Sequence, residues 1–136
     1  MNDIRVTHTL RDFEDDQRDI AKRAGVDMRA CVLEGIRAGN ELAKDFARTK
    51  NGPKSHSRKY PGTFSAEMNP TFHGFGTSIY SGQYGPRPSG QGLLAPILEN
   101  GSRSGNAPQM NLAKSADAIG PSFAQEVRGL PDRWFW

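Results

Sequence analysis

Between residues 27 and 49, apolar and small side chains recur at alternating steps of four and three positions, the spacing of one face of an α-helix. The stripe consists of Met28, Val32, Gly35, Gly39, Leu42 and Phe46. Asn51-Gly52-Pro53 follows and ends the pattern, because glycine and proline continue a helix poorly. The sequence therefore predicts a core helix over residues 27–49. Its two glycines either let another backbone approach closely or weaken the helix by roughly 1 kcal/mol each.

A second, more polar helix is predicted upstream, over residues 10–24. Thr9 can cap its first turn with a side-chain oxygen, and Gly25 can supply a left-handed stop. Its apolar face is thin, and the few apolar residues on it are Leu10, Phe13, Ile20, Ala21 and Ala24. A helix this polar is either exposed or buried only by another subunit.

The middle of the chain holds most of the 15 glycines and 9 prolines, so it is expected to form turns, short strands and long loops. Residues 50–61 are predicted to be a basic loop. Alternating or β-branched runs predict strands at residues 63–68, 75–80 and 93–98. Residues 81–92, SGQYGPRPSGQG, are expected to be a long hairpin loop or a flexible tip that a neighbouring subunit orders.

The end of the chain predicts a third helix over residues 109–118, opened by Pro108 and interrupted at Gly120-Pro121. A further turn is expected over residues 121–127. Leu130-Pro131 is then expected to lead the chain out of helix, so that the last residues form a polar tether with aromatic ends. Trp134, Phe135 and Trp136 either anchor the chain in a neighbour or fold back over Phe123 and Val127.

These elements predict an α+β fold with two N-terminal helices, a small antiparallel sheet with long loops and a C-terminal helix packed on the sheet. The 136 residues suit one domain. Residues 9–49 form its helical part, residues 50–108 its loops and strands, and residues 109–136 its C-terminal helix and aromatic tail. Only 35% of the residues are hydrophobic, which favours an oligomer that completes the burial of each subunit.

Residue types that carry catalysis are sparse and scattered. The single cysteine, Cys31, lies in the apolar stripe and is expected to be a buried small side chain rather than a ligand. His8, His56 and His73 show no metal-binding spacing, and no GxSxG elbow or phosphate-binding loop occurs. We therefore expect a non-enzymatic protein without a cofactor or metal, and a small hydrolase is disfavoured. No apolar run suggests a signal peptide or a membrane span, so we expect no membrane partner and assembly in a reducing cytoplasm.

Charge is distributed unevenly along the chain. Acidic side chains crowd the first predicted helix, at Asp12, Glu14, Asp15, Asp16 and Asp19. Cations crowd a later segment, from the end of the second predicted helix onward, at Lys44, Arg48, Lys50, Lys54, Arg58 and Lys59. This asymmetry suits head-to-tail contact between copies, a basic loop facing an acidic partner, or simply two solvated faces. An alternative function is a small basic nucleic-acid-binding protein that uses the segment 48–59 on phosphates.

Residues 93–127, LLAPILENGSRSGNAPQMNLAKSADAIGPSFAQEV, resemble a family of tailed-bacteriophage neck and tail-completion proteins, which includes lambda minor tail protein Z-like proteins. The matching pattern runs from Leu94 through Glu99 and Gly101, then through Pro108 into the last helix. Upstream, residues 58–64 stand where the family's basic segment enters its first strand. Asn100 and Ser102 depart from the usual aromatic and threonine, and the acidic first helix and the RWFW end have no counterpart in the family.

The resemblance implies a structural subunit of a head-tail connector, located in the virion and assembled in the host cytoplasm. It implies a cyclic ring around the DNA channel, with six copies as the first expectation and twelve as the second. Head-closure or connector proteins and tail-terminator or tail-tube proteins would be its neighbours, with non-specific proximity to packaged DNA. Expected subunit contacts are Glu99, Arg103, Trp134, Phe135 and Trp136. Expected contacts to the channel or an acidic partner are Arg48, Lys50, Lys54, Arg58 and Lys59.

Overall fold

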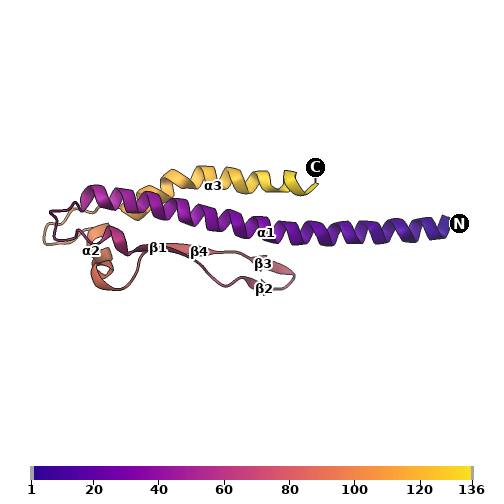
Figure 1. Cartoon of the computed structure of the whole chain (residues 1–136), viewed down its shortest axis with the longest axis horizontal. Helices are drawn as coiled ribbons and strands as arrows, with labels where there is room; N and C mark the ends of the chain where they lie inside the picture. The colour runs from indigo at the N-terminus through magenta and orange to yellow at the C-terminus, as the bar shows by residue number, and fades with distance from the viewer. Residues whose placement is uncertain (1, 136) are drawn as a thin grey trace.

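The chain folds around one long helix, α1, which spans Asn2–Lys50. The computed structural model describes residues 2–135, and the side chains from residue 10 onward. At about 1.5 Å per residue, a helix of 49 residues is about 70 Å long. The prediction of two helices separated at Gly25 is wrong, because α1 runs through this position without a break (Figure 1). One glycine costs about 1 kcal/mol, which the favourable residues on both sides of it can offset.

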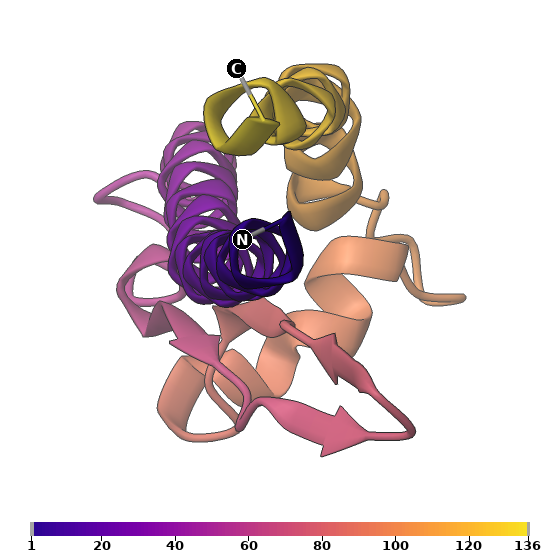
Figure 2. The ribbon, with the colours of Figure 1, turned by 90° about the vertical axis from the view of Figure 1, so that its right-hand side faces the viewer.

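The second long helix, α3 (Asn111–Phe135), runs antiparallel to α1 and covers one side of it (Figures 1 and 2). Pro121 and Pro131 lie inside α3, so the predicted interruption and the predicted exit from helix are both wrong. Each proline removes one backbone hydrogen bond. Both prolines are exposed, where water can bond the carbonyl that each one frees, and buried residues such as Leu130 hold the helix against its neighbours.

A two-stranded ribbon lies on the opposite side of α1 (Figure 2). Its inner part pairs β1 (Phe64–Met68) with β4 (Gly82–Pro86), antiparallel, in the register Phe64↔Pro86. Its outer part pairs β2 (Phe72–Gly74) with β3 (Thr77–Ile79). Phe75 and Gly76 turn the chain between β2 and β3 with positive φ angles of 54° and 72°.

The strand predictions have mixed outcomes. The strand expected at residues 63–68 is confirmed as β1, and β3 occupies part of the expected strand 75–80. The expected long loop at 81–92 is wrong in its first half, which is β4. The strand expected at 93–98 is also wrong, because this segment lies in a 3₁₀-helix, η2 (Gly90–Leu94), and a short helix, α2 (Ala95–Asn100). Pro96 stands in the first turn of α2, where proline favours a helix.

The α+β class is confirmed, but the three layers are arranged differently from the expectation: α1 lies between α3 and the ribbon. The core gathers near the C-terminal end of α1, where Ala43 and Ala47 pack with Tyr60 and Phe64. Pro61, at the start of the 3₁₀-helix η1 (Pro61–Thr63), is buried beside them. Among the described residues, no helix is long and apolar enough to cross a membrane.

The two glycines of the apolar stripe allow close packing, but by side chains rather than by another backbone. A Cβ on Gly35 would lie 2.8 Å from the Phe123 ring of α3. A Cβ on Gly39 would lie 2.6 Å from the Tyr84 ring of β4 and 2.7 Å from Ile119 of α3. Gly39 is therefore the point at which all three layers meet.

Candidate functional site

The basic segment after α1 has a fixed backbone. The amide of Asn51 donates to the Ala47 carbonyl (2.8 Å) and to Gln109 Oε1 (2.8 Å), and Gln109 donates back to Asn51 Oδ1 (3.1 Å). The Ser57 hydroxyl also donates to Asn51 Oδ1. These bonds tie the end of α1 to the residues just before α3. Asn51 is buried, so the network is shielded from competing water.

Gln91 also holds the basic segment, through two hydrogen bonds. The backbone N–H of Lys59 donates to Gln91 Oε1 (2.7 Å), and the amide of Gln91 donates to the His56 carbonyl (2.9 Å). One glutamine of η2 thus fixes two points of the basic segment. The sequence signal for this role was weak, because a glutamine between two glycines reads as part of a loop.

The structure gathers the predicted cations at one end of the molecule. They are all exposed: Arg48, Lys50, Lys54, Arg58 and Lys59. A surface hollow of about 580 Å³ lies there. Its lining consists of Arg48, Asn51, Gly52, Pro53, Arg58, Lys59, Pro61 and Gly62. We call this surface the basic end. Its fixed backbone and outward cations suit it to hold an anionic group or an acidic segment.

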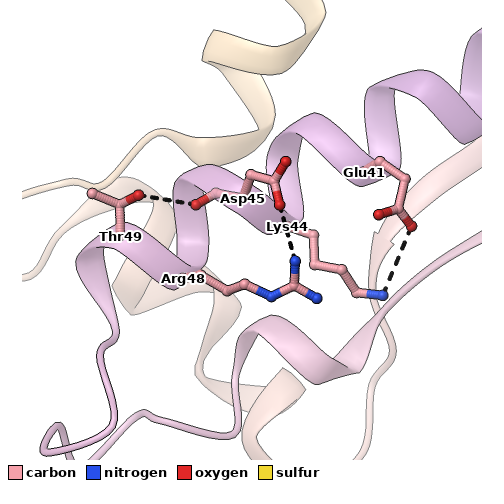
Figure 3. A network of polar contacts seen from close by, with 5 residues as sticks. All are labelled: Glu41, Lys44, Asp45, Arg48 and Thr49. Carbon is pink, nitrogen blue, oxygen red and sulfur yellow. Dashed lines mark hydrogen bonds and ion pairs between the residues drawn. The ribbon is translucent and has the colours of Figure 1, made fainter.

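Part of this charge is already compensated on α1 (Figure 3). Arg48 Nη1 lies 2.9 Å from Asp45 Oδ1, and Lys44 Nζ lies 3.9 Å from Glu41 Oε1. Both are i,i+3 pairs at the surface, although Lys44 is half-buried, and such pairs contribute about 0–1 kcal/mol. Within the described part of the chain, no ion pair involves Lys50, Lys54, Arg58 or Lys59. These four cations are the ones available to a partner.

Glu99, expected at a subunit contact, is buried inside this chain with 7% of its surface exposed. Its Oε2 accepts from the backbone N–H of Asn111 (2.7 Å), the first residue of α3, and its Oε1 accepts from the Tyr60 hydroxyl (3.1 Å). A carboxylate at a helix N-terminus is favoured by the helix dipole. Burial raises the pKa of the Tyr60 hydroxyl, and the Glu99 carboxylate raises it further. The structure therefore gives Glu99 a structural role in joining α2, α3 and the core.

The other expected contact residues are scattered. Arg103 is exposed in the loop between α2 and α3, and the bonds of the Glu99 carboxylate go to Tyr60 and Asn111 instead. Trp134 lies half-buried on α3, and its indole N–H donates to Asp27 Oδ2 of α1 (2.7 Å). Phe135 is exposed, and Trp136 lies outside the described residues. The expected solvated tether is therefore wrong, because residues 131–135 continue α3, and Trp134 bonds to α1.

Exposed apolar side chains lie at the ribbon tip and at the start of α1. The ribbon tip presents Phe75, whose side chain is fully exposed, beside the half-exposed Phe72 and Ile79. The start of α1 extends past the end of α3 and past the ribbon tip (Figure 1). Leu10 and Phe13 are 58% and 60% exposed there. We call residues 10–19 of α1 the acidic end; the thin apolar face of this region had already suggested exposure or cover by another subunit.

One histidine of the ribbon lies within hydrogen-bond distance of a serine. His73 Nδ1 lies 2.9 Å from Ser78 Oγ, but these residues face each other across the exposed β2–β3 hairpin, which would leave a reacting group in water. No group of three or more His, Cys, Asp or Glu side chains in the described part of the chain could hold a metal ion. Cys31 is buried, as predicted, and burial raises the pKa of its thiol.

Comparison of the chain with models of protein families, with curated proteins and with solved structures found no match.

Proposed function

We propose that this protein is a non-enzymatic structural subunit of a bacteriophage head-tail connector, which assembles with copies of itself into a ring around the DNA channel. The observation that carries the proposal is the exposed start of α1. Leu10 and Phe13 are exposed there on a charged helix, and a surface that combines exposed apolar and charged side chains is suited to a partner. The placement in a phage neck rests on the sequence resemblance of residues 93–127.

The fixed backbone of the basic end supports the same proposal. A subunit that joins two particles must present its contact surface in a defined geometry, and the bonds of Asn51 and Gln91 fix that geometry before a partner arrives. A preformed surface loses less conformational freedom on binding than a flexible loop does. Neighbours of this subunit would be a head-closure or connector protein on one side and a tail-terminator or tail-tube protein on the other.

The test is the mass of the purified protein. Light scattering and native mass spectrometry at tens of micromolar should give a discrete particle of six or twelve copies of the 15.0 kDa chain. Electron microscopy should show that particle as a closed ring with a central hole. A monomer at every concentration, with no ring, would contradict the proposal.

A second candidate function is nucleic-acid binding, which the available cations at the basic end favour. Lys50, Lys54, Arg58 and Lys59 would contact phosphates without reading bases. The affinity for a short duplex would then fall steeply as salt rises from 50 to 200 mM, and Arg58→Glu with Lys59→Glu would abolish it. A monomer that shows this behaviour would favour the second function over the first.

A further inference from the structure

The two ends of the molecule carry opposite charges. Acidic side chains surround the exposed start of α1, at Glu14, Asp15, Asp16 and Asp19. Asp15 lies 3.6 Å from Arg18, in an exposed pair that neutralises only part of this charge. The uncompensated cations lie at the basic end, beyond the last turn of α1. Figure 1 places the two at opposite ends of the longest axis.

The two charged ends cannot contact each other within one molecule. Asp15 and Lys50 are separated by 35 residues of continuous helix, which at 1.5 Å per residue is about 50 Å. Screening in physiological salt acts over about 8 Å. Any partner of either end must therefore be another molecule, and a second copy of this chain carries the complementary charge in each case.

We propose that the acidic end of each copy docks in the basic end of the next copy. The hollow of about 580 Å³ there would receive the helix, and Lys54, Arg58 and Lys59 would face Asp16 and Asp19, which lie on one side of α1. The inference deepens the proposed ring, on which it rests, by naming the contact that closes it. Contact between unlike surfaces yields a ring when successive rotations close.

Apolar groups support the same pairing. Leu10 and Phe13 are exposed among the acidic residues. Leu93 and Ile97 are exposed on η2 and α2, a few residues after Gln91, which holds the basic segment. The acidic end therefore combines apolar and charged side chains, and exposed apolar side chains lie on the elements that hold the basic segment, as in many protein interfaces. Charge would set the direction of docking, and burial of these apolar groups would add affinity.

Charge exchange between two variants tests the proposal. The acid-reversed variant carries Glu14→Lys, Asp16→Lys and Asp19→Lys, and the base-reversed variant carries Lys54→Glu, Arg58→Glu and Lys59→Glu. Each has like charges at its two ends and should remain monomeric when alone. A one-to-one mixture should assemble again, because each acidic surface then meets a basic one, and the copies should alternate around an even-numbered ring.

The control variant carries Asp117→Lys, a reversal at an exposed position of α3 that belongs to neither end. It should assemble like the unmodified chain. The association constant of the unmodified chain should fall at least about tenfold between 50 and 500 mM salt, because salt screens the charged contact. Circular dichroism should show that both reversed variants stay helical, because all changed residues are exposed.

The outcomes separate the two proposals. If the unmodified chain forms a ring and the reversed variants do too, the docking proposal is wrong and the ring stands. If the reversed variants are folded monomers whose mixture stays monomeric, the docking proposal is also wrong, because opposite charge was restored without effect. If the unmodified chain never assembles, the ring fails and the docking proposal fails with it.

Discussion

The two halves of α1 form one continuous helix but differ in how much of the chain packs against them. Residues 27–50 lie between α3 and the ribbon, and their contacts begin with Asp27, which accepts from Trp134. Residues 10–19 extend past both layers, and residues 10–24 are exposed apart from Ile20 and Ala24. The comparison teaches that tertiary packing need not cover a helix along its whole length. Once the packed half of α1 has formed, the helix can extend turn by turn into the exposed half without the cost of a new nucleus.

The largest effect should come from truncating one apolar side chain in the packed part of the molecule and one in the exposed half of α1. Leu130 of α3 is 1% exposed, so Leu130→Ala should lower the free energy of unfolding by about 2–5 kcal/mol. Phe13→Ala, at a position 60% exposed, should change it by less than about 0.5 kcal/mol in the monomer. Chemical denaturation of both variants measures this. Equal losses would show that the start of α1 is packed as well.

A smaller effect, with opposite signs, should come from adding one methyl group at each of two glycines of α1, Gly39 inside the packed half and Gly25 at its edge. Gly39→Ala would place a Cβ 2.6 Å from the Tyr84 ring, inside the contact of three layers, and should cost about 1–3 kcal/mol. Gly25→Ala meets only the Tyr80 hydroxyl at 2.7 Å, the far end of a flexible side chain. The gain in helix propensity should then dominate and stabilise the protein by up to about 1 kcal/mol. Melting temperatures that fall in both variants would contradict this difference.

The smallest effect is a loss of stability at alkaline pH, caused by Tyr60 in the core near the C-terminal end of α1. Tyr60 is fully buried beside Ala43 and Ala47, and its raised pKa means that the folded protein keeps a proton that the unfolded chain releases near pH 10. Its contribution is complete below pH 10 and is lost as the pH rises further, by at most about 1.4 kcal/mol per pH unit.

Alkaline unfolding curves check this prediction. Tyr60→Phe should be less stable at neutral pH, because Glu99 loses a donor, but should lose less as the pH rises above 10. Tyr80→Phe keeps Tyr60 and should retain the full alkaline loss. An unchanged alkaline slope in Tyr60→Phe would show that other groups cause it.

Sequence reasoning worked where one pattern excluded its alternatives. The stripe from Met28 to Phe46 fits only a helix, and the strict alternation around Phe64 fits only a strand; both were confirmed. It failed where a local signal competed with packing. Glycine and proline often end helices, but α1 continues through Gly25 and α3 continues through Pro121. Residues 93–98 form an apolar run too short for its period to separate strand from helix.

At the candidate site, too, some features could be predicted from the sequence and others could not. Exposed cations could be predicted because lysine and arginine after a helix rarely become buried. The buried environment of Glu99 could not, since it depends on Tyr60 and Asn111, which approach it only in the folded chain. The inner strand β4 was missed because it lies in a segment rich in glycine and proline, where strand signals are weak.

The bond between Asp27 and Trp134 also has a consequence for synthesis. The two residues are 107 positions apart, and at roughly 5–20 residues per second the ribosome adds Trp134 about 5–20 seconds after Asp27. During that interval α1 exists without its cover, and the face that holds Cys31 and Gly35 is open to other nascent chains. A chaperone that binds apolar helices would have its main opportunity in those seconds, and slower translation of α3 would prolong its access.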